Sequence, residues 1–143
     1  RDLVGRGTVG AIGVSNFGPR HLEAMAELPA ANQIATSPYQ DNRATVNWCR
    51  ERGISLMSHS PLSVPGLLGE PLLRDLADRY RRSAALIVLR WILQKGLVPL
   101  PSSTDPEHIK ENLRALEFEL DEPAMAALDS LGGRGDPATV ALA

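Results

Sequence analysis

The chain has 143 residues, 43% hydrophobic and 22% charged, which is the composition of one globular domain rather than of a disordered chain. A net charge of −2 leaves no basic surplus for nucleic acid, and the apolar runs, such as residues 84–89, fall short of the roughly 20 residues that cross a membrane. The one cysteine, Cys49, excludes an internal disulfide, and no secretory leader is recognisable, so we expect a cytoplasmic protein.

The first part of the chain alternates short apolar segments with helical patterns. Strands are expected over residues 8–14 and 32–36, because both segments are rich in apolar and β-branched residues and end in polar turns. Helices are expected over residues 21–28, and from a cap at Asp41 or Asn42 to Gly53.

The same alternation continues to the end of the chain. Strands are expected over residues 54–58 and 97–100. Helices are expected over residues 72–80, 84–95 (capped by Ser83), 107–116 (begun by Asp105-Pro106) and 120–131 (with Pro123 in its first turn).

Four strand-then-helix units without a hairpin signal indicate an α/β fold with a parallel sheet. Two architectures remain open, a doubly wound sheet and half of a (β/α)8 TIM barrel. No Gly-x-Gly-x-x-Gly motif follows any strand, whereas polar residues follow every strand, which favours the barrel, whose site is built at the carboxyl ends of its strands. A complete barrel needs about 250 residues, so the chain amounts to about four βα units, or half of one.

Several segments, in order, resemble the aldo-keto reductase family, and together they cover nearly all of the chain. They are Ala11–Phe17 (AIGVSNF), Asn32–Ile34 with Ser37–Tyr39, Ser58–Leu62 (SHSPL), Leu89–Trp91, Val98–Ser103 (VPLPSS) and His108–Leu113 (HIKENL). The resemblance implies that residues 1–143 are the carboxyl-terminal half of a barrel that binds NADP(H) and reduces aldehydes or ketones by hydride transfer.

The resemblance also implies a role for residues at three strand ends. Ser15, Asn16 and Gln33 match positions that hydrogen-bond the nicotinamide carboxamide, although Ser15 and Asn16 could instead simply cap a turn. His59, followed in the same motif by Ser60 and Leu62, stands where the family usually has an aromatic residue that stacks on the nicotinamide ring. The alternative for His59 is a hydrogen bond at the strand end without cofactor contact.

A second group of residues matches the adenosine side of the cofactor site. Ser102, Ser103, Thr104 and His108 stand at the 2′-phosphate positions, where the family commonly has a lysine and an arginine in place of Ser102 and His108. Loss of both charges weakens the preference for NADP, so NAD is a possible cofactor. Glu111 and Asn112 match positions that meet the adenine, and would otherwise be solvated helix residues.

No catalytic residue is assigned within this chain, because the family's proton-donor tyrosine and its lysine, aspartate and histidine partners lie in the other half of the barrel. Tyr39 follows a strand, but neither Lys95 nor Lys110 is expected beside it, so the isolated chain should be inactive. No metal site is expected. The expected partners are a small carbonyl substrate and a missing amino-terminal half or second chain; the alternative is a non-catalytic half-barrel for cofactor binding or assembly.

Overall fold

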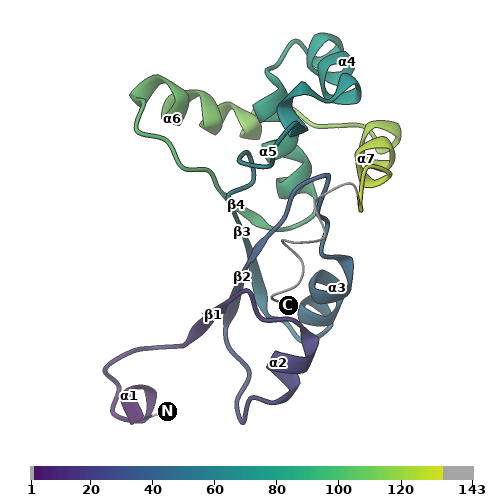
Figure 1. The fold of residues 1–143 in the computed structure, drawn as a ribbon. Coiled ribbons are helices and arrows are strands. Elements are labelled where there is room, and N and C mark those ends of the chain that lie inside the picture. Colours follow the sequence, from purple (N-terminus) through teal and green to yellow (C-terminus); the bar gives the residue numbers. More distant parts are fainter. Residues whose placement is uncertain (1, 134–143) are drawn as a thin grey trace.

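Four parallel strands form a single sheet in the order β1-β2-β3-β4 in the computed structural model, which describes residues 2–133 (Figure 1). The strands are β1 (Gly13–Ser15), β2 (Ala31–Ala35), β3 (Ser55–His59) and β4 (Val98–Leu100). The α-helices are α1 (Asp2–Gly5), α2 (Pro19–Glu23), α3 (Arg43–Glu51), α4 (Pro71–Tyr80), α5 (Ala84–Gln94), α6 (Pro106–Leu113) and α7 (Glu122–Asp129). Two 3₁₀ turns, η1 (Leu67–Gly69) and η2 (Arg114–Leu116), complete the elements. The expected α/β class with parallel strands is confirmed.

The sheet is covered by helices on one face. Successive strand residues point to opposite faces, and Asn32, Ile34, Leu56 and Ser58 are buried on the face against which α3 and α5 pack. On the opposite face every strand residue is at least partly exposed. That face carries Gly13, Ser15, Ala31, Gln33, Ala35, Ser55, Met57, His59, Val98 and Leu100. Parallel sheets are normally covered on both faces, whereas the helices of residues 2–133 cover one face of this sheet.

Helix α5 is the centre of the core, because it is apolar on nearly every side. Ile87, Val88, Trp91 and Ile92 are fully buried, and the Trp91 indole donates a hydrogen bond to Asp129 at 2.8 Å. Ser83 caps the helix as expected by accepting a hydrogen bond from the backbone of Leu86. Even α5 has only 11 residues, and within residues 2–133 no helix is long and apolar enough to cross a membrane.

Several elements differ in length from the sequence expectations, among them the helix expected over 120–131, which is α7 over Glu122–Asp129. The strand expected over residues 8–14 is only Gly13–Ser15, because β1 pairs with β2, and β2 begins at Ala31, the partner of Gly13. The helix expected over 21–28 ends at Glu23. Leu22 is the one buried residue of α2, and Pro29 disfavours helical geometry at the residue that precedes it. The helix expected over 107–116 is α6 followed by the 3₁₀ turn η2.

Candidate functional site

The carboxyl ends of the four strands lie along one edge of the sheet, because all strands run in the same direction. Ser15 pairs in register with Gln33, and His59 lies between Ala35 and Leu100. The side chains of Ser15, Gln33 and His59 therefore share the face that no helix of residues 2–133 covers. The strand register thus places these three residues near the carboxyl ends of their strands, on the same face of the sheet.

The turn after β1 holds Asn16 in a left-handed backbone conformation with φ 58°, which asparagine adopts more readily than most residues. Its backbone N–H donates to the Gln33 carbonyl at 2.8 Å, and the Ser15 hydroxyl donates to the same oxygen at 3.2 Å. From the helix-covered face, the buried Asn32 amide donates to the Phe17 carbonyl at 2.7 Å. The turn is thus tied to β2 on both of its faces.

His59 closes this cluster from β3. Its Nε2 lies 2.8 Å from Asn16 Oδ1, and its Nδ1 lies 3.4 Å from the hydroxyl of Ser60, which has a positive φ of 52°. Ala35 of β2, the strand between β1 and β3, pairs in register with His59 and carries only a methyl group. The cluster offers amide, hydroxyl and imidazole groups side by side, a set suited to binding a planar amide or aromatic group.

Leu62 is separate from these polar groups. It is partly buried and packs against both hydrophobic clusters of the core. It belongs to the loop that follows β3, and its contacts are those of a core residue.

A second polar group lies in the loop between β4 and α6. The Ser103 hydroxyl accepts from the backbone of Asp105 at 3.1 Å, and Asp105 Oδ1 accepts from the backbone of Glu107 at 2.9 Å. His108 Nδ1 lies 3.9 Å from Asp105 Oδ2, and Ser102 and Thr104 are exposed in the same loop. Asp105 begins the helix, as expected. Its carboxylate accepts the hydrogen bond of the Glu107 N–H group and places negative charge beside His108. The Asp-Pro pair, a common N-cap and first-turn combination, is the sequence signal for this.

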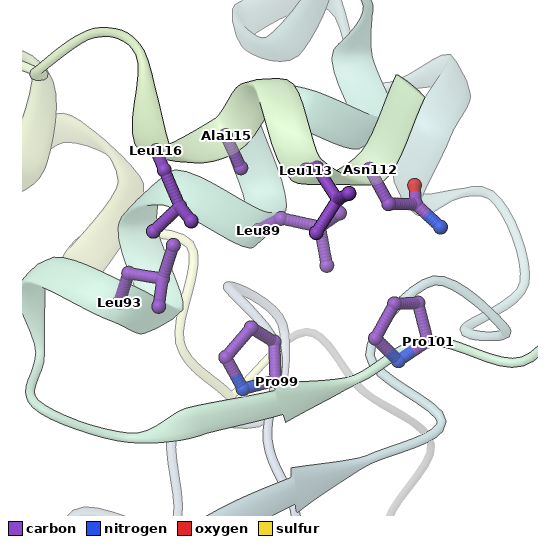
Figure 2. Close-up of a pocket in the computed structure, with 8 residues that line it drawn as sticks. All are labelled: Leu89, Leu93, Pro99, Pro101, Asn112, Leu113, Ala115 and Leu116. Atoms are coloured by element: carbon purple, nitrogen blue, oxygen red, sulfur yellow. The ribbon is translucent and has the colours of Figure 1, made fainter. Parts of the chain in front are cut away.

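A pocket of about 230 Å³ lies between α5, β4 and the α6–η2 segment (Figure 2). Its walls are mostly apolar and include Leu89, Pro99 and Leu116. Asn112 contributes the amide at one end of the row of side chains in Figure 2, whereas Glu111, its neighbour, is partly buried outside the lining. Of the residues expected near adenine, Asn112 therefore borders a cavity.

Three further side chains that carry a transferable proton are each in contact with a carboxylate of this chain. The Tyr39 hydroxyl donates to the Glu70 carboxylate, Lys95 pairs with Asp129 at 2.8 Å and Lys110 pairs with Glu107 at 2.8 Å. Burial raises the pKa of the Cys49 thiol, an effect partly offset by the Asn32 hydrogen bond and the Arg52 charge. Within residues 2–133 no three histidine, cysteine, aspartate or glutamate side chains are grouped to hold a metal ion.

Comparisons with known proteins identify the family. Residues 1–132 match the model of the Aldo/keto reductase family. The chain is 40% identical to the Uncharacterized oxidoreductase YtbE of Bacillus subtilis, over 90% of this chain and 48% of that protein. It is 36% identical to Aldo-keto reductase family 1 member D1 of Mus musculus, over 87% of this chain and 44% of that protein.

Solved structures give the same result for the fold. The aldose reductase from Schistosoma japonicum superimposes with a TM-score of 0.88 at 28% identity. The superposition covers 99% of this chain and 48% of the aldose reductase chain. Gox0644 superimposes with a TM-score of 0.86 at 34% identity, over 92% of this chain and 50% of its own. The chain thus spans about half the length of the relatives it matches, and its parallel sheet corresponds to about half of their TIM barrel. This chain belongs to the aldo/keto reductase family of oxidoreductases.

Proposed function

We propose that residues 1–143 are the carboxyl-terminal half of an NADP(H)-dependent aldo-keto reductase, contributing about four βα units to its barrel. The coverage of about half of each relative supports a half-barrel, and the order of the motifs supports its being the later half. The uncovered face of the sheet has the side chains that such a barrel would enclose.

The cofactor site of this half is the cluster at the ends of β1, β2 and β3, and the contact between Asn16 and His59 is the observation that carries the proposal. Ser15, Asn16 and Gln33 supply donors and acceptors for the nicotinamide carboxamide, and the His59 ring supplies a flat face. Bound NADPH supplies the hydride that, with a proton, converts an aldehyde or ketone to an alcohol. The residues of this chain hold and orient the ring from which the hydride leaves.

The adenosine end of the cofactor binds along the loop from Ser102 to His108 and along α6. Ser103 and Thr104 carry hydroxyl donors for a 2′-phosphate, and Asn112 borders the neighbouring pocket. Asp105 lies in that loop, and neither lysine nor arginine occupies positions 102–108. NADP is the proposed cofactor. Because no lysine or arginine at positions 102–108 can pair with a 2′-phosphate, NAD is a competent substitute.

The proton for the carbonyl comes from outside this chain. The Tyr39 hydroxyl donates to the Glu70 carboxylate, and Lys95 and Lys110 are each paired with a carboxylate, Asp129 and Glu107. The partners are therefore a small carbonyl substrate and an amino-terminal half, or a second chain, that completes the barrel and supplies the acid.

Fluorescence titration of the full chain with NADPH tests the cofactor site. Gln33→Ala should weaken binding about three- to tenfold, the effect of one hydrogen bond. Ser55→Ala is the matched control, because Ser55 lies on the same sheet face at the amino end of β3, and should leave the affinity unchanged. Equal affinity in all three proteins, or no binding to any, would contradict the proposed site.

A non-catalytic half-barrel is the second candidate, and the exposed leucines of α6 and η2 favour it because they suit an assembly surface. The two functions differ in turnover. The chain alone should bind NADPH without oxidising it in the presence of a simple aldehyde. Turnover should appear once the amino-terminal half is supplied, whereas an assembly module would remain inactive.

A further inference from the structure

His59 and Asn16 form a contact that joins the ends of two strands that are not neighbours in the sheet. The two residues are 43 positions apart, and His59 Nε2 lies 2.8 Å from Asn16 Oδ1 across Ala35 of β2. The backbone of Asn16 is independently fixed by its bond to Gln33. The remaining freedom of Asn16 is the rotation of its side-chain amide, and this rotation is what His59 restricts.

The contact determines which atoms carry protons. An amide oxygen only accepts hydrogen bonds, so the imidazole must present Nε2–H to Asn16. The opposite nitrogen, Nδ1, faces the Ser60 hydroxyl at 3.4 Å, which can donate to it. With Oδ1 held by His59, the orientation of the Asn16 amide is fixed and its two Nδ2 hydrogens remain to donate to a ligand in the cluster.

We infer that His59 is a positioning residue that fixes the Asn16 amide with its donors toward the ligand, and thereby selects a carboxamide oxygen there. This inference rests on the proposed nicotinamide site and adds a role that stacking alone does not provide. Stacking uses the ring face of His59, whereas positioning uses its edge. Substitutions can therefore separate the two roles.

Two substitutions of His59 preserve one role each. His59→Phe keeps a flat aromatic ring but has no N–H, and His59→Gln keeps an N–H donor at a similar reach but has no ring. Each variant would be titrated with NADPH and with its thionicotinamide analogue, whose sulfur is a weaker acceptor than the carboxamide oxygen. The ratio of the two Kd values measures selection for the oxygen and is independent of stacking strength.

The wild-type chain should bind NADPH about three- to tenfold more tightly than the thio analogue, as expected for one hydrogen bond. His59→Gln should retain this ratio even if both affinities fall, and His59→Phe should bring it close to one. A ratio retained in His59→Phe would overturn the inference, as would a ratio lost in both variants.

A ligand-free measurement separates failure of this inference from failure of the proposed function. Nitrogen-15 NMR of the imidazole should report the Nε2–H tautomer of His59 in the wild-type chain near pH 8, and a mixture of tautomers in Asn16→Ala. An unchanged tautomer would overturn the positioning role even if NADPH binds. Absence of NADPH binding together with the expected tautomer change would instead refute the cofactor site and leave the contact intact.

Discussion

Asn32 is a fully buried polar residue that supports the candidate site from below. Its amide donates to the Phe17 carbonyl, one residue beyond Asn16, and lies 3.9 Å from the sulfur of Cys49 on α3. A buried carbonyl without a donor costs about 1–3 kcal/mol, so this bond favours one conformation of the turn. Asn32 thus links the helix layer to the turn that presents Asn16 on the opposite face.

Cys49 should be chemically inert in the folded chain. It is fully buried, and burial raises the pKa of its thiol, so the reactive thiolate is scarce at neutral pH. Reaction with a disulfide reagent at pH 7.5 should be slow in buffer and become fast in denaturing urea. Cys49→Ala should remove the urea-dependent signal. Equal rates in buffer and in urea would mean that the core packed against α3 does not cover the thiol.

The residue types of the candidate site could be predicted from sequence, whereas their contacts could not. Polar residues at the strand ends identify Ser15, Asn16 and His59 as members of one edge, whereas Gln33 lies inside a strand and is identified by the family resemblance. The bond between Asn16 and His59 depends on a positive φ, on the register of three strands and on the small size of Ala35. Register is set by packing of the whole sheet, which no local pattern contains.

At the scale of elements, helix starts follow from side-chain chemistry. Ser83, Asp105 and Asp121 each accept a hydrogen bond from a backbone N–H in the first turn of α5, α6 and α7. Such caps satisfy N–H groups that have no partner inside the helix. Gly53 and Gly96, both at positive φ, follow the ends of α3 and α5, where residues with a Cβ would be strained.

The cap of α7 should make the stability of the chain depend on pH. The pKa of Asp121 is lowered, first by the hydrogen bond from the Ala124 backbone and further by Tyr80 and Arg79. A lowered pKa means that the carboxylate stabilises the fold above the ordinary aspartate range near 3.8 and that this contribution is lost as pH falls through and below it.

Thermal unfolding of two variants tests this cap. At pH 7, Asp121→Ala should have a lower Tm than wild type, and Asp121→Asn should lie between them because it keeps the accepting oxygen. Near pH 3 the difference between wild type and Asp121→Ala should shrink. A difference that does not change with pH would show that the carboxylate charge has no part in the cap.

Strand boundaries were predictable where an apolar run ends in polar turn residues. Strands β2, β3 and β4 begin and end within one residue of the expected positions, since apolar runs and polar turns delimit them. Strand β1 is shorter than its β-branched sequence suggests, because only Gly13–Ser15 pair with β2. Helix α2 is short because one buried leucine provides little packing to extend it.

At the scale of the whole molecule, the described residues form a parallel sheet that helices cover on one face. Within residues 2–133, β1 and β4 each pair with a single strand, so each leaves one edge open. Beside the β4 edge, Val98 is 52% exposed, and Leu113 and Leu116 are each 66% exposed. Open edges and grouped apolar side chains promote association with another polypeptide.

The full chain on its own should therefore associate in a concentration-dependent manner and bind a dye that reports exposed apolar surface. Val98→Lys and Leu113→Lys should each lower both signals, because a charge placed at the β4 edge or on α6 opposes its burial. Leu68→Lys, at a 40% exposed leucine of η1, is the matched control and should leave both unchanged. Sedimentation velocity over a hundredfold range of concentration measures the association. A monomer at every concentration with no dye binding would mean that the uncovered face is stable in water, and the case for a missing half would then rest on the relatives alone.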